Sequence, residues 1–419
     1  MSMSMPSVLT PSPRLKLPAG LALEWPGGSA GRGSAPVRVR LGSRSMLARL
    51  SVGDIGDLAD AYVRGELEID GALPDVMEVA GELAGDPVRK GARGAWPGLL
   101  RRWRSRWQHR PPRDAEHVRF HYDVSDDFYA LWLDPLRVYS CAYYATPAMS
   151  LEGAQRAKLD LVCRKLMLAP GQTLLDIGAG WGGLLIWAAA HYGVRAVGIT
   201  LSQHQYEHVN AQIDACGLRG RVEMRLLDYR DLPAGERYDR IASIGMFEHV
   251  GDARLDDYFA RLYALLRPGG LLLNHGIAAG GLDNAELGAG MGRFIERHIF
   301  PGGELVHVSR AVQSLARSGC ELLDAENLRP HYARTLWAWS AALEAQLDRA
   351  RACADEATIR AYRLYLAGSA MCFERGWLSL YQLLAARPDG STGPGWAAHS
   401  DYPYTRSHLF ASPQRALGV

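Results

Sequence analysis

An aspartate and a glycine-rich turn follow a short apolar run near the middle of the chain. Residues 173–177 read Thr-Leu-Leu-Asp-Ile, and the next six residues contain four glycines. The apolar run predicts a buried strand, and the pattern over 184–192 predicts a helix. A glycine turn between a strand and a helix brings backbone amides close to a ligand, because no Cβ blocks the approach. The candidate ligand-binding residues of this turn are Gly178, Gly180 and Gly182.

Asp176 indicates which kind of ligand the turn binds. Two phosphates beside this carboxylate would be disfavoured by charge repulsion, which argues against a dinucleotide. A cationic amino-acid group would be favoured there instead, and S-adenosylmethionine carries such a group. We therefore predict that S-adenosylmethionine binds at this turn as a co-substrate, with Asp176 facing its amino-acid part.

The next predicted strand, 194–200, departs from the usual nucleotide-binding pattern. No acidic residue follows it to hold the ribose hydroxyls, so Thr200 and Gln205 are the candidates for that role. Ser202 and Gln205 also have the spacing of a helix capping box, and both interpretations can hold together.

The third predicted strand, 222–227, ends at Asp228 and Tyr229. These residues are placed to bind the adenine amino group and to cover the ring. An acid directly after a strand is also a common helix cap, so Asp228 has a structural alternative.

Composition excludes several classes of protein. The 419 residues include 47 basic and 45 acidic side chains, so no global positive charge points to nucleic acid. The six cysteines are scattered without a Cys-x-x-Cys pair or a zinc-like His cluster, which predicts a reduced compartment and no metal. No apolar run is long enough to span a membrane. We expect a cytoplasmic enzyme that meets lipid only from the surface, at the inner face of the membrane.

The alternation of strand and helix patterns after residue 113 predicts a doubly wound, Rossmann-like α/β domain over 113–419. A smaller, mainly helical N-terminal domain is expected over 37–112, and residues 1–36 are expected to carry little order because they are rich in Pro, Gly and Ser. Within the smaller domain, 89–113 holds nine Arg or Lys, no acid, and a Trp-rich helical face. This segment predicts either an interfacial helix drawn to anionic lipid or a linker helix packed on the next domain.

Several blocks, in order, resemble the cyclopropane fatty acid synthase and mycolic acid cyclopropane synthase family. The resemblance runs from about His121 to about Gln382. Its blocks are His121–Asp123, Asp127–Pro135, Tyr139–Tyr144, Asp176–Gly183, Ser243–Gly251, Phe294–Gly303 and Tyr332–Leu336. It implies a methyltransferase that acts on the double bond of an unsaturated phospholipid acyl chain and closes a cyclopropane ring. A homodimer is also possible.

The resemblance also implies roles for individual residues. Tyr139 and Ser140 correspond to residues that contact the methionine part of the cofactor. A bound bicarbonate would act as the base, held by the side chains of Glu248, His275 and Tyr332 and by the amides of Cys141 and Ile277. Trp181, Phe247, Phe294 and Phe300 would lie near the cofactor or line the acyl tunnel, or else belong to the core. Gly276, between His275 and Ile277, is expected to loosen that segment.

Each catalytic candidate also has a structural alternative. Glu248 after an apolar strand could cap a helix, His275 could be a satisfied buried histidine, and Tyr332 could pack a helix start. Two other reactions remain open. A hydride shift instead of ring closure would give a methyl-branched or methylene fatty acid, and a small-molecule methyltransferase shares parts of the pattern.

Overall fold

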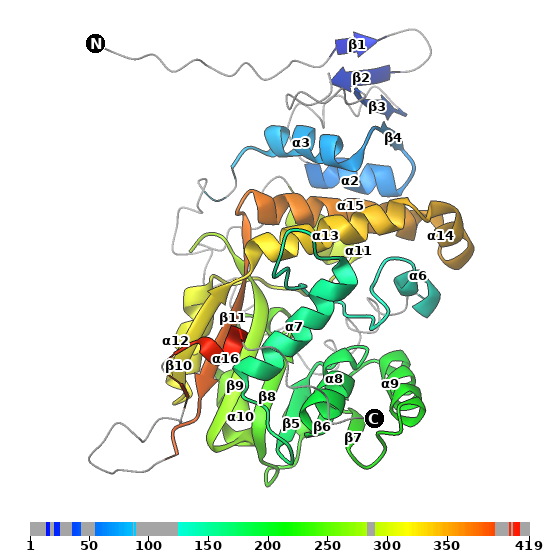
Figure 1. Ribbon diagram of the computed structural model, residues 1–419. Helices are drawn as coiled ribbons and strands as arrows, with labels where there is room; N and C mark the ends of the chain where they lie inside the picture. The colour runs from blue at the N-terminus through cyan, green and yellow to red at the C-terminus, as the bar shows by residue number, and fades with distance from the viewer. Residues whose placement is uncertain are drawn as a thin grey trace, which may run out of the picture.

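A seven-stranded sheet forms the centre of the larger part of the molecule in the computed structural model (Figure 1). The structure describes residues 14–16, 21–25, 36–42, 55–86, 88, 125–282, 290–389, 402–403 and 405–410. The strands are β5 (Thr173–Ile177), β6 (Arg195–Thr200), β7 (Val222–Leu226), β8 (Tyr238–Ile244), β9 (Leu266–Ala279), β10 (Glu321–Asn327) and β11 (Leu378–Ala386). Their order is β10-β11-β9-β8-β5-β6-β7. Strands β9, β8, β5, β6 and β7 run parallel, and β11 is antiparallel to both of its neighbours.

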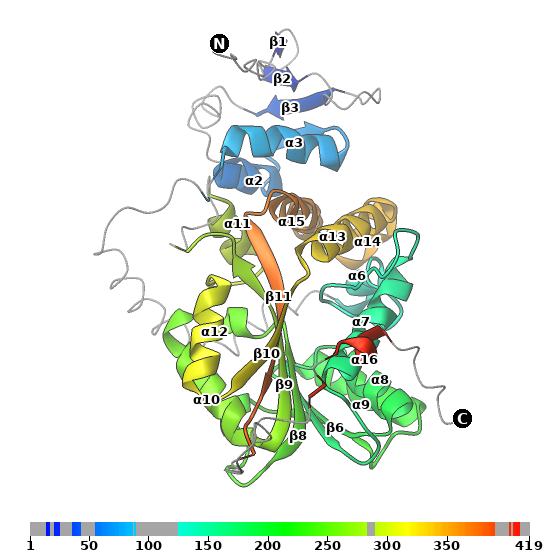
Figure 2. The ribbon, with the colours of Figure 1, turned by 60° about the vertical axis from the view of Figure 1, so that its left-hand side comes forward.

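Helices cover both faces of this sheet, as the predicted doubly wound fold requires (Figure 2). One face carries α7 (Leu151–Lys165), α8 (Gly183–Tyr192) and α9 (Gln203–Ala215), and the other carries α10 (Leu255–Leu265) and α12 (Val308–Arg317). Successive strand residues point to opposite faces, so Leu174 packs into the core on one side and Leu175 into the core on the other. This double burial explains why β5 reads as an uninterrupted apolar run apart from Asp176.

A helical layer lies across one end of the sheet, between the sheet and the N-terminal part (Figures 1 and 2). It contains α11 (Met291–His298), α13 (Arg329–Glu344), α14 (Leu347–Cys353) and α15 (Glu356–Glu374), with the short α6 (Asp126–Ala130) beside it. Most of α15 is buried, because it packs against α13 on one side and against the N-terminal helices on the other. A single core cluster joins this layer to the N-terminal part.

The N-terminal part contains a sheet as well as helices. Strands β1 (Arg14–Lys16), β2 (Leu21–Trp25), β3 (Val37–Leu41) and β4 (Leu67–Asp70) form an antiparallel sheet in that order. Helices α2 (Ile55–Val63) and α3 (Leu73–Ala84) lie between this sheet and α15 (Figure 1). Within residues 1–36, for which little order was expected, the described residues form β1 and β2. Leu23 and Trp25 alternate into the core there, within a stretch whose flanking Pro, Gly and Ser residues obscured the pattern.

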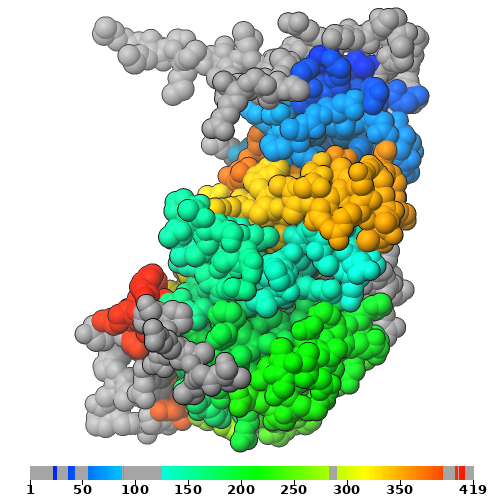
Figure 3. Space-filling model, turned by 45° about the vertical axis from the view of Figure 1, so that its right-hand side comes forward, coloured from blue at the N-terminus to red at the C-terminus, as the bar shows by residue number. Residues whose placement is uncertain are grey.

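The N-terminal part packs directly on the helical layer, as the contact between the light-blue and orange segments in Figure 3 shows. Asp60 of α2 is 5% exposed; its carboxylate accepts from Arg297 and lies 2.8 Å from Nε2 of His298, both on α11. At Gly56 a Cβ would lie 2.2 Å from the backbone oxygen of Gly290, so the two backbones touch. Because α11 also contributes to the cavity described below, this attachment reaches the site.

Some sequence predictions fall outside the described residues. These are the basic, Trp-rich helix over 89–113, the domain boundary near 111–113 and the His121–Asp123 block. In the part of the chain that the structure describes, no helix is both long and apolar enough to cross a membrane. The short helix α16 (Ser407–Phe410) packs against α7.

Candidate active site

A cavity of about 460 Å³ is lined by residues at the carboxyl ends of the parallel strands and by residues of the helical layer. Its wall also includes Val88, from the end of the N-terminal part. Every predicted site residue except Gly182 lines it. These are Tyr139, Ser140, Cys141, Asp176, Gly178, Gly180, Thr200, Gln205, Asp228, Tyr229, Glu248, His275, Ile277 and Tyr332.

The turn connects β5 to α8 as predicted, but two of its amides bond within the protein instead of remaining open to a ligand. The amides of Gly178 and Ala179 both donate to the carbonyl of Ile199, at 3.1 and 3.0 Å, and Gly178 has a φ of +75°. Gly182, which was predicted to bind the cofactor, does not line the cavity. A Cβ there would lie 2.8 Å from Val209, so glycine serves the packing of α8 against α9.

Asp176 is a buried acid at the end of β5, 3% exposed. Burial raises its pKa to about 7, and the charge of Lys158 opposes this shift. Its Oδ1 has no hydrogen-bond partner among the described residues. A buried carboxylate oxygen without a partner is costly unless a ligand donates to it, so Asp176 is suited to a cationic group.

Thr200 and Gln205 act as a pair. The Thr200 hydroxyl donates to Gln205 Oε1 at 2.7 Å and accepts from the Ser202 amide at 3.1 Å. Ser202 Oγ in turn accepts from the amide of Gln205 at 3.3 Å, so only one half of the capping box forms. The amide nitrogen Nε2 of Gln205 is buried and lacks a partner within the described chain, which leaves it available to a ligand.

Asp228 has the structural role that the sequence left open. It caps the 3₁₀ helix Tyr229–Asp231 by accepting from the Arg230 amide at 2.9 Å, and it also pairs with the Arg230 guanidinium. Both Asp228 and Tyr229 nevertheless line the cavity. A ligand at Asp228 would therefore share the carboxylate with Arg230.

The segment that carries Tyr139 to Cys141 is held from two sides. The Tyr139 hydroxyl donates to that of Tyr365 on α15 at 3.2 Å, and its ring packs against Trp132 and Trp339. Burial raises the pKa of the Cys141 thiol, so this sulfur is a poor nucleophile. This agrees with the prediction that its backbone, rather than its thiol, serves the site.

Glu248 lies in the 3₁₀ helix Phe247–His249, directly after β8 and Gly245. Its Oε1 accepts from the Ile277 amide at 2.6 Å, and burial raises its pKa to about 7. The other oxygen, Oε2, is buried without a protein partner in the described residues. Glu248 therefore presents one unbonded oxygen in a site where it can exchange a proton near neutral pH.

His275 is a neutral donor or acceptor in this site. Its Nδ1 lies 3.1 Å from Nε2 of Gln382, its register partner on β11. With that amide nitrogen as the donor, the imidazole proton resides on Nε2, which has no described partner. Burial and the nearby charge of Lys158 hold the pKa of His275 well below its usual value.

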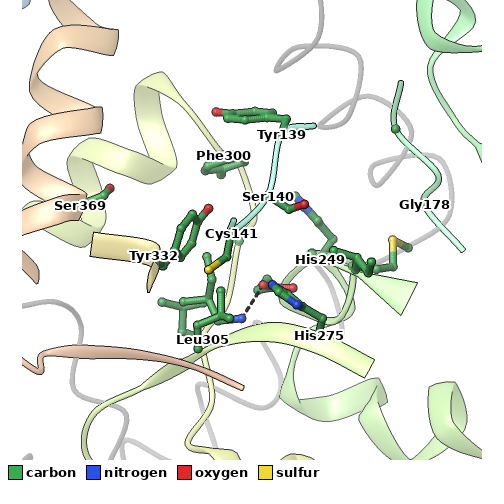
Figure 4. Close-up of a pocket in the computed structure, with 18 of the residues that line it drawn as sticks. Tyr139, Ser140, Cys141, Gly178, His249, His275, Phe300, Leu305, Tyr332 and Ser369 are labelled. Atoms are coloured by element: carbon green, nitrogen blue, oxygen red, sulfur yellow. Dashed lines mark hydrogen bonds between the residues drawn. The ribbon is translucent and has the colours of Figure 1, made fainter. Parts of the chain in front are cut away.

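Tyr332, Cys141 and His275 come from three different parts of the chain and lie around one space (Figure 4). Tyr332 belongs to α13 and packs on Phe373 with ring centroids 4.8 Å apart. Among the four aromatic candidates, Trp181 and Phe300 line the cavity. Phe247 and Phe294 are buried in the core and are not part of the cavity wall.

Gly276 does not loosen its segment, contrary to expectation. It lies within β9, where a Cβ would be 1.9 Å from Cε1 of Phe247. The missing side chain lets Phe247 pack against the strand, and this places the neighbouring Glu248 opposite Ile277.

We expect Gly276→Ala to lower the free energy of unfolding by roughly 1–3 kcal/mol, the usual cost of overpacking, and to reduce activity further by displacing Phe247. Thermal unfolding and turnover would be measured together. Gly235→Ala is the control, because a Cβ there meets nothing within 4 Å. Equal stability of the two variants would contradict the prediction.

Two polar residues of the site were not predicted from the sequence. Lys158 on α7 is 1% exposed, and Gln382 on β11 is fully buried. Each is a polar residue in a segment that is otherwise buried. A polar residue at such a position is the sequence feature that could have identified it as part of the site. The described residues contain no group of three or more His, Cys, Asp or Glu side chains that could hold a metal ion.

These residues fit S-adenosylmethionine. The turn at Gly178 and Gly180 leaves the backbone accessible, Asp176 offers an unbonded carboxylate oxygen, and Gln205 offers an unbonded amide. The three groups lie at the carboxyl edge of a parallel sheet, where such folds bind nucleotides.

Comparison with known proteins gives a consistent result. The family model for mycolic acid cyclopropane synthetase matches residues 109–383. A probable fatty acid methyltransferase of Pseudomonas putida is 42% identical over 399 residues, which cover 94% of this chain and 97% of that protein. The solved structure of the cyclopropane synthase MmaA2 from Mycobacterium tuberculosis is 40% identical, with a TM-score of 0.61 over 65% of this chain and 98% of that chain. The structure of mycolic acid cyclopropane synthase CmaA1 complexed with SAH and CTAB is 37% identical, with a TM-score of 0.61 over 65% of this chain and 97% of that chain.

The sheet order, the glycine turn and the buried acid define an S-adenosylmethionine-dependent methyltransferase. With the family model matching more than half of its length, the chain belongs to the mycolic acid cyclopropane synthetase family.

Proposed function

We propose that this enzyme methylates a carbon of the double bond in an unsaturated fatty acyl chain. The observation that carries the proposal is the continuity of the cavity. It extends from the cofactor turn, past Glu248 and His275, to an apolar wall formed by Leu336, Phe373, Trp377, Leu378 and Leu380. An acyl chain fits such a wall, whereas a small polar amine would leave it uncovered. The description of the Pseudomonas putida relative as a probable fatty acid methyltransferase supports the same substrate class.

The site's residues suit the demands of this chemistry. When bound, S-adenosylmethionine supplies an electrophilic methyl group. An alkene is a weak nucleophile, so the walls must hold it in line with that methyl at close range. Addition leaves a positive charge on the acyl chain, and the rings of Phe300, Tyr332 and Phe373 face the cavity where π faces can stabilise a cation. Burial of Tyr332 and Phe373 also keeps water from the cation.

The fate of the cation decides the product. A hydride shift followed by loss of a proton from the added methyl group gives a methylene chain, and loss of a proton from a neighbouring chain carbon gives a methyl-branched alkene. Both products keep one double bond, and we propose this outcome as the first candidate. Loss of a proton from the added methyl group instead closes a cyclopropane ring. Ring closure is the second candidate, and it is favoured by the convergence of Glu248, His275 and Tyr332 on one space.

The proton acceptor is also a proposal. Bicarbonate would be held by Glu248, His275, Tyr332 and the amides of Cys141 and Ile277. In this structure the Ile277 amide already donates to Glu248. Bicarbonate binding therefore requires that bond to open. If that bond stays closed, Glu248 itself is a buried group in the cavity wall that can accept the proton. We further propose that the acyl chain is carried by a phospholipid and is reached from the cytoplasmic face of the membrane.

The test is incubation of the purified enzyme with S-adenosylmethionine and vesicles of cis-unsaturated phospholipid, followed by mass spectrometry and proton NMR of the acyl chains. A gain of one CH₂ with vinylidene or branched-methyl signals supports the first candidate. The same gain with upfield ring protons supports ring closure, and dependence on added bicarbonate identifies the base. No change in acyl mass with any unsaturated lipid would overturn the proposed substrate class.

A further inference from the structure

Three polar side chains from adjacent strands form a row across the sheet beside the cavity. Gln382 on β11 is the register partner of His275 on β9 and also of Glu326 on β10. Directly paired residues of neighbouring strands project to the same face of a sheet, so the three side chains are neighbours. Of these three residues, only His275 lines the cavity, where it is drawn in Figure 4.

The outer end of this row is an ion pair. Lys165 of α7 donates to Oε2 of Glu326 at 2.5 Å. Lys165 and Gln382 are fully buried and His275 is 1% exposed, whereas the side chain of Glu326 is 30% exposed. The row therefore connects a charged pair near the surface to an imidazole in the site. Buried polar groups in such a row strongly favour one hydrogen-bonding arrangement, because a donor or acceptor without a partner is costly there.

We propose that Gln382 is a positioning residue that keeps the proton of His275 on Nε2, and that the ion pair at the end of the row holds Gln382 in the required orientation. Nε2 of Gln382 lies 3.1 Å from Nδ1 of His275, which is a hydrogen-bond distance. An amide nitrogen can only donate, so Nδ1 is the acceptor and the ring proton resides on Nε2. With the amide reversed, its oxygen would accept from Nδ1 and leave Nε2 as a base.

The charges around the row favour this orientation of the amide. Burial and the positive charges of Lys158 and Lys165 hold the pKa of His275 well below its usual value, so positive charge acts on this end of the row. Positive charge attracts the amide oxygen of Gln382 and repels its nitrogen. It also stabilises that oxygen, which is buried and has no hydrogen-bond partner in the described part of the chain. Glu326 would pull the other way, but its carboxylate is paired with Lys165.

The consequence is that His275 presents a donor to the cavity. Its Nε2 is buried and meets no protein acceptor among the described residues. With the proton there, the imidazole can bind an acceptor oxygen but cannot remove a proton from the acyl cation. Proton removal then falls to Glu248 or to an anion held beside it. This consequence rests on the proposed function, whereas the position of the ring proton does not.

The test locates the ring proton by NMR and needs no substrate. Long-range ¹H–¹⁵N correlations of enzyme labelled with ¹⁵N-histidine distinguish the two neutral tautomers, and the signals of His275 are assigned from their loss in His275→Gln. We expect the proton on Nε2 in wild type. In Gln382→Glu an ionised carboxylate can only accept, so Nδ1 should become protonated. Gln382→Met has no donor, so both tautomers should be populated. This second variant also serves should the buried carboxylate prevent folding.

Turnover should follow the ring proton. With S-adenosylmethionine and vesicles of cis-unsaturated phospholipid, both Gln382 variants should lower kcat by roughly 10- to 100-fold, the usual cost of removing a partner that orients a ligand-binding histidine, while the KM for S-adenosylmethionine stays within about twofold. Absence of wild-type turnover would count against the proposed function, and the NMR result would still decide the tautomer.

Lys165→Met tests the outer end of the row, and Arg310→Met is its matched control. Arg310 lies on α12, which covers the opposite face of the sheet, and it pairs with Asp252 at 2.7 Å. Each variant removes the cation of an ion pair, so each should lower thermal stability. Only Lys165→Met should populate the tautomer of His275 with the proton on Nδ1.

Three results would count against the assignment. A proton on Nδ1 in wild type would overturn it, and so would an unchanged proton on Nε2 in both Gln382 variants. An unchanged proton in Lys165→Met, with the Gln382 variants altered, would overturn the part assigned to the ion pair.

Discussion

Replacing Glu248 with glutamine should lower turnover by roughly 10²–10⁴-fold, the usual contribution of a general acid or base, and leave cofactor affinity within a few-fold of wild type. Glutamine has the same shape and keeps an oxygen that can accept from the Ile277 amide, so the local structure should survive. What is lost is the buried carboxylate whose second oxygen has no partner in the described chain. Because burial raises the pKa of Glu248 to about 7, it can accept a proton at neutral pH.

The measurement is single-turnover methyl transfer across pH 6 to 9. A base with this pKa must be deprotonated to act, so the wild-type rate should rise through about pH 7 and the variant should lack that rise. Glu304→Gln is the control: Glu304 lines the same cavity, but its carboxylate accepts from the Asp252 amide at 3.2 Å. A Glu248→Gln enzyme that keeps more than a tenth of wild-type turnover would exclude Glu248 as the group that exchanges the proton.

Asp176→Asn should weaken S-adenosylmethionine binding by roughly 10- to 100-fold, because a buried hydrogen bond between charged groups becomes one between a charged and a neutral group. In wild type the affinity should also depend on pH. The pKa of the ligand-free carboxyl is raised to about 7 by burial, and a bound ammonium would lower it. The contribution of Asp176 to the affinity is therefore fully present above about pH 7 and falls as the pH drops below that value, by up to about tenfold per unit.

Calorimetric titrations at pH 6, 7 and 8 would check both parts of this prediction. The asparagine variant should bind weakly with little change over this range. Asp134→Asn provides the comparison: Asp134 is also buried and its pKa is also raised by burial, but it bonds to backbone amides and does not line the cavity. That variant should retain the pH dependence. A wild-type affinity that is constant between pH 6 and 8 would contradict the proposed contact.

Local sequence patterns were enough to predict the elements that carry the cofactor candidates. The strand over 173–177, the turn and the following helix are determined by residues that lie close together in the sequence. Thr200 and Gln205 were also named from a local pattern, and both line the cavity, but their hydrogen bond to each other was not predicted. The family resemblance supplied the remaining candidates, which the fold then brings to one cavity.

Contacts between distant segments could not be predicted in this way. The bond from the Ile277 amide to Glu248 depends on how β9 lies beside the end of β8, and the contact of Gln382 with His275 depends on the register of β11. Gly182 lies in a glycine-rich turn that is typical of ligand binding, yet the space beside it is filled by Val209 from another helix. The strands β1 and β2 are short. β1 pairs with β2, and β2 also pairs with β3, so their formation depends on residues outside their own segments.

Through Val88, the N-terminal part contributes to the wall of the cavity. A Cβ at Gly281 would lie 3.5 Å from its Cγ1, so the two chain segments meet at the wall of the site. The solved cyclopropane synthase MmaA2 corresponds to only 65% of this chain, although it is matched over 98% of its own length. A chimera that exchanges N-terminal parts between relatives should therefore inherit part of its acyl preference from the donor, and the two parts of this enzyme are expected to have diverged together rather than as independent modules.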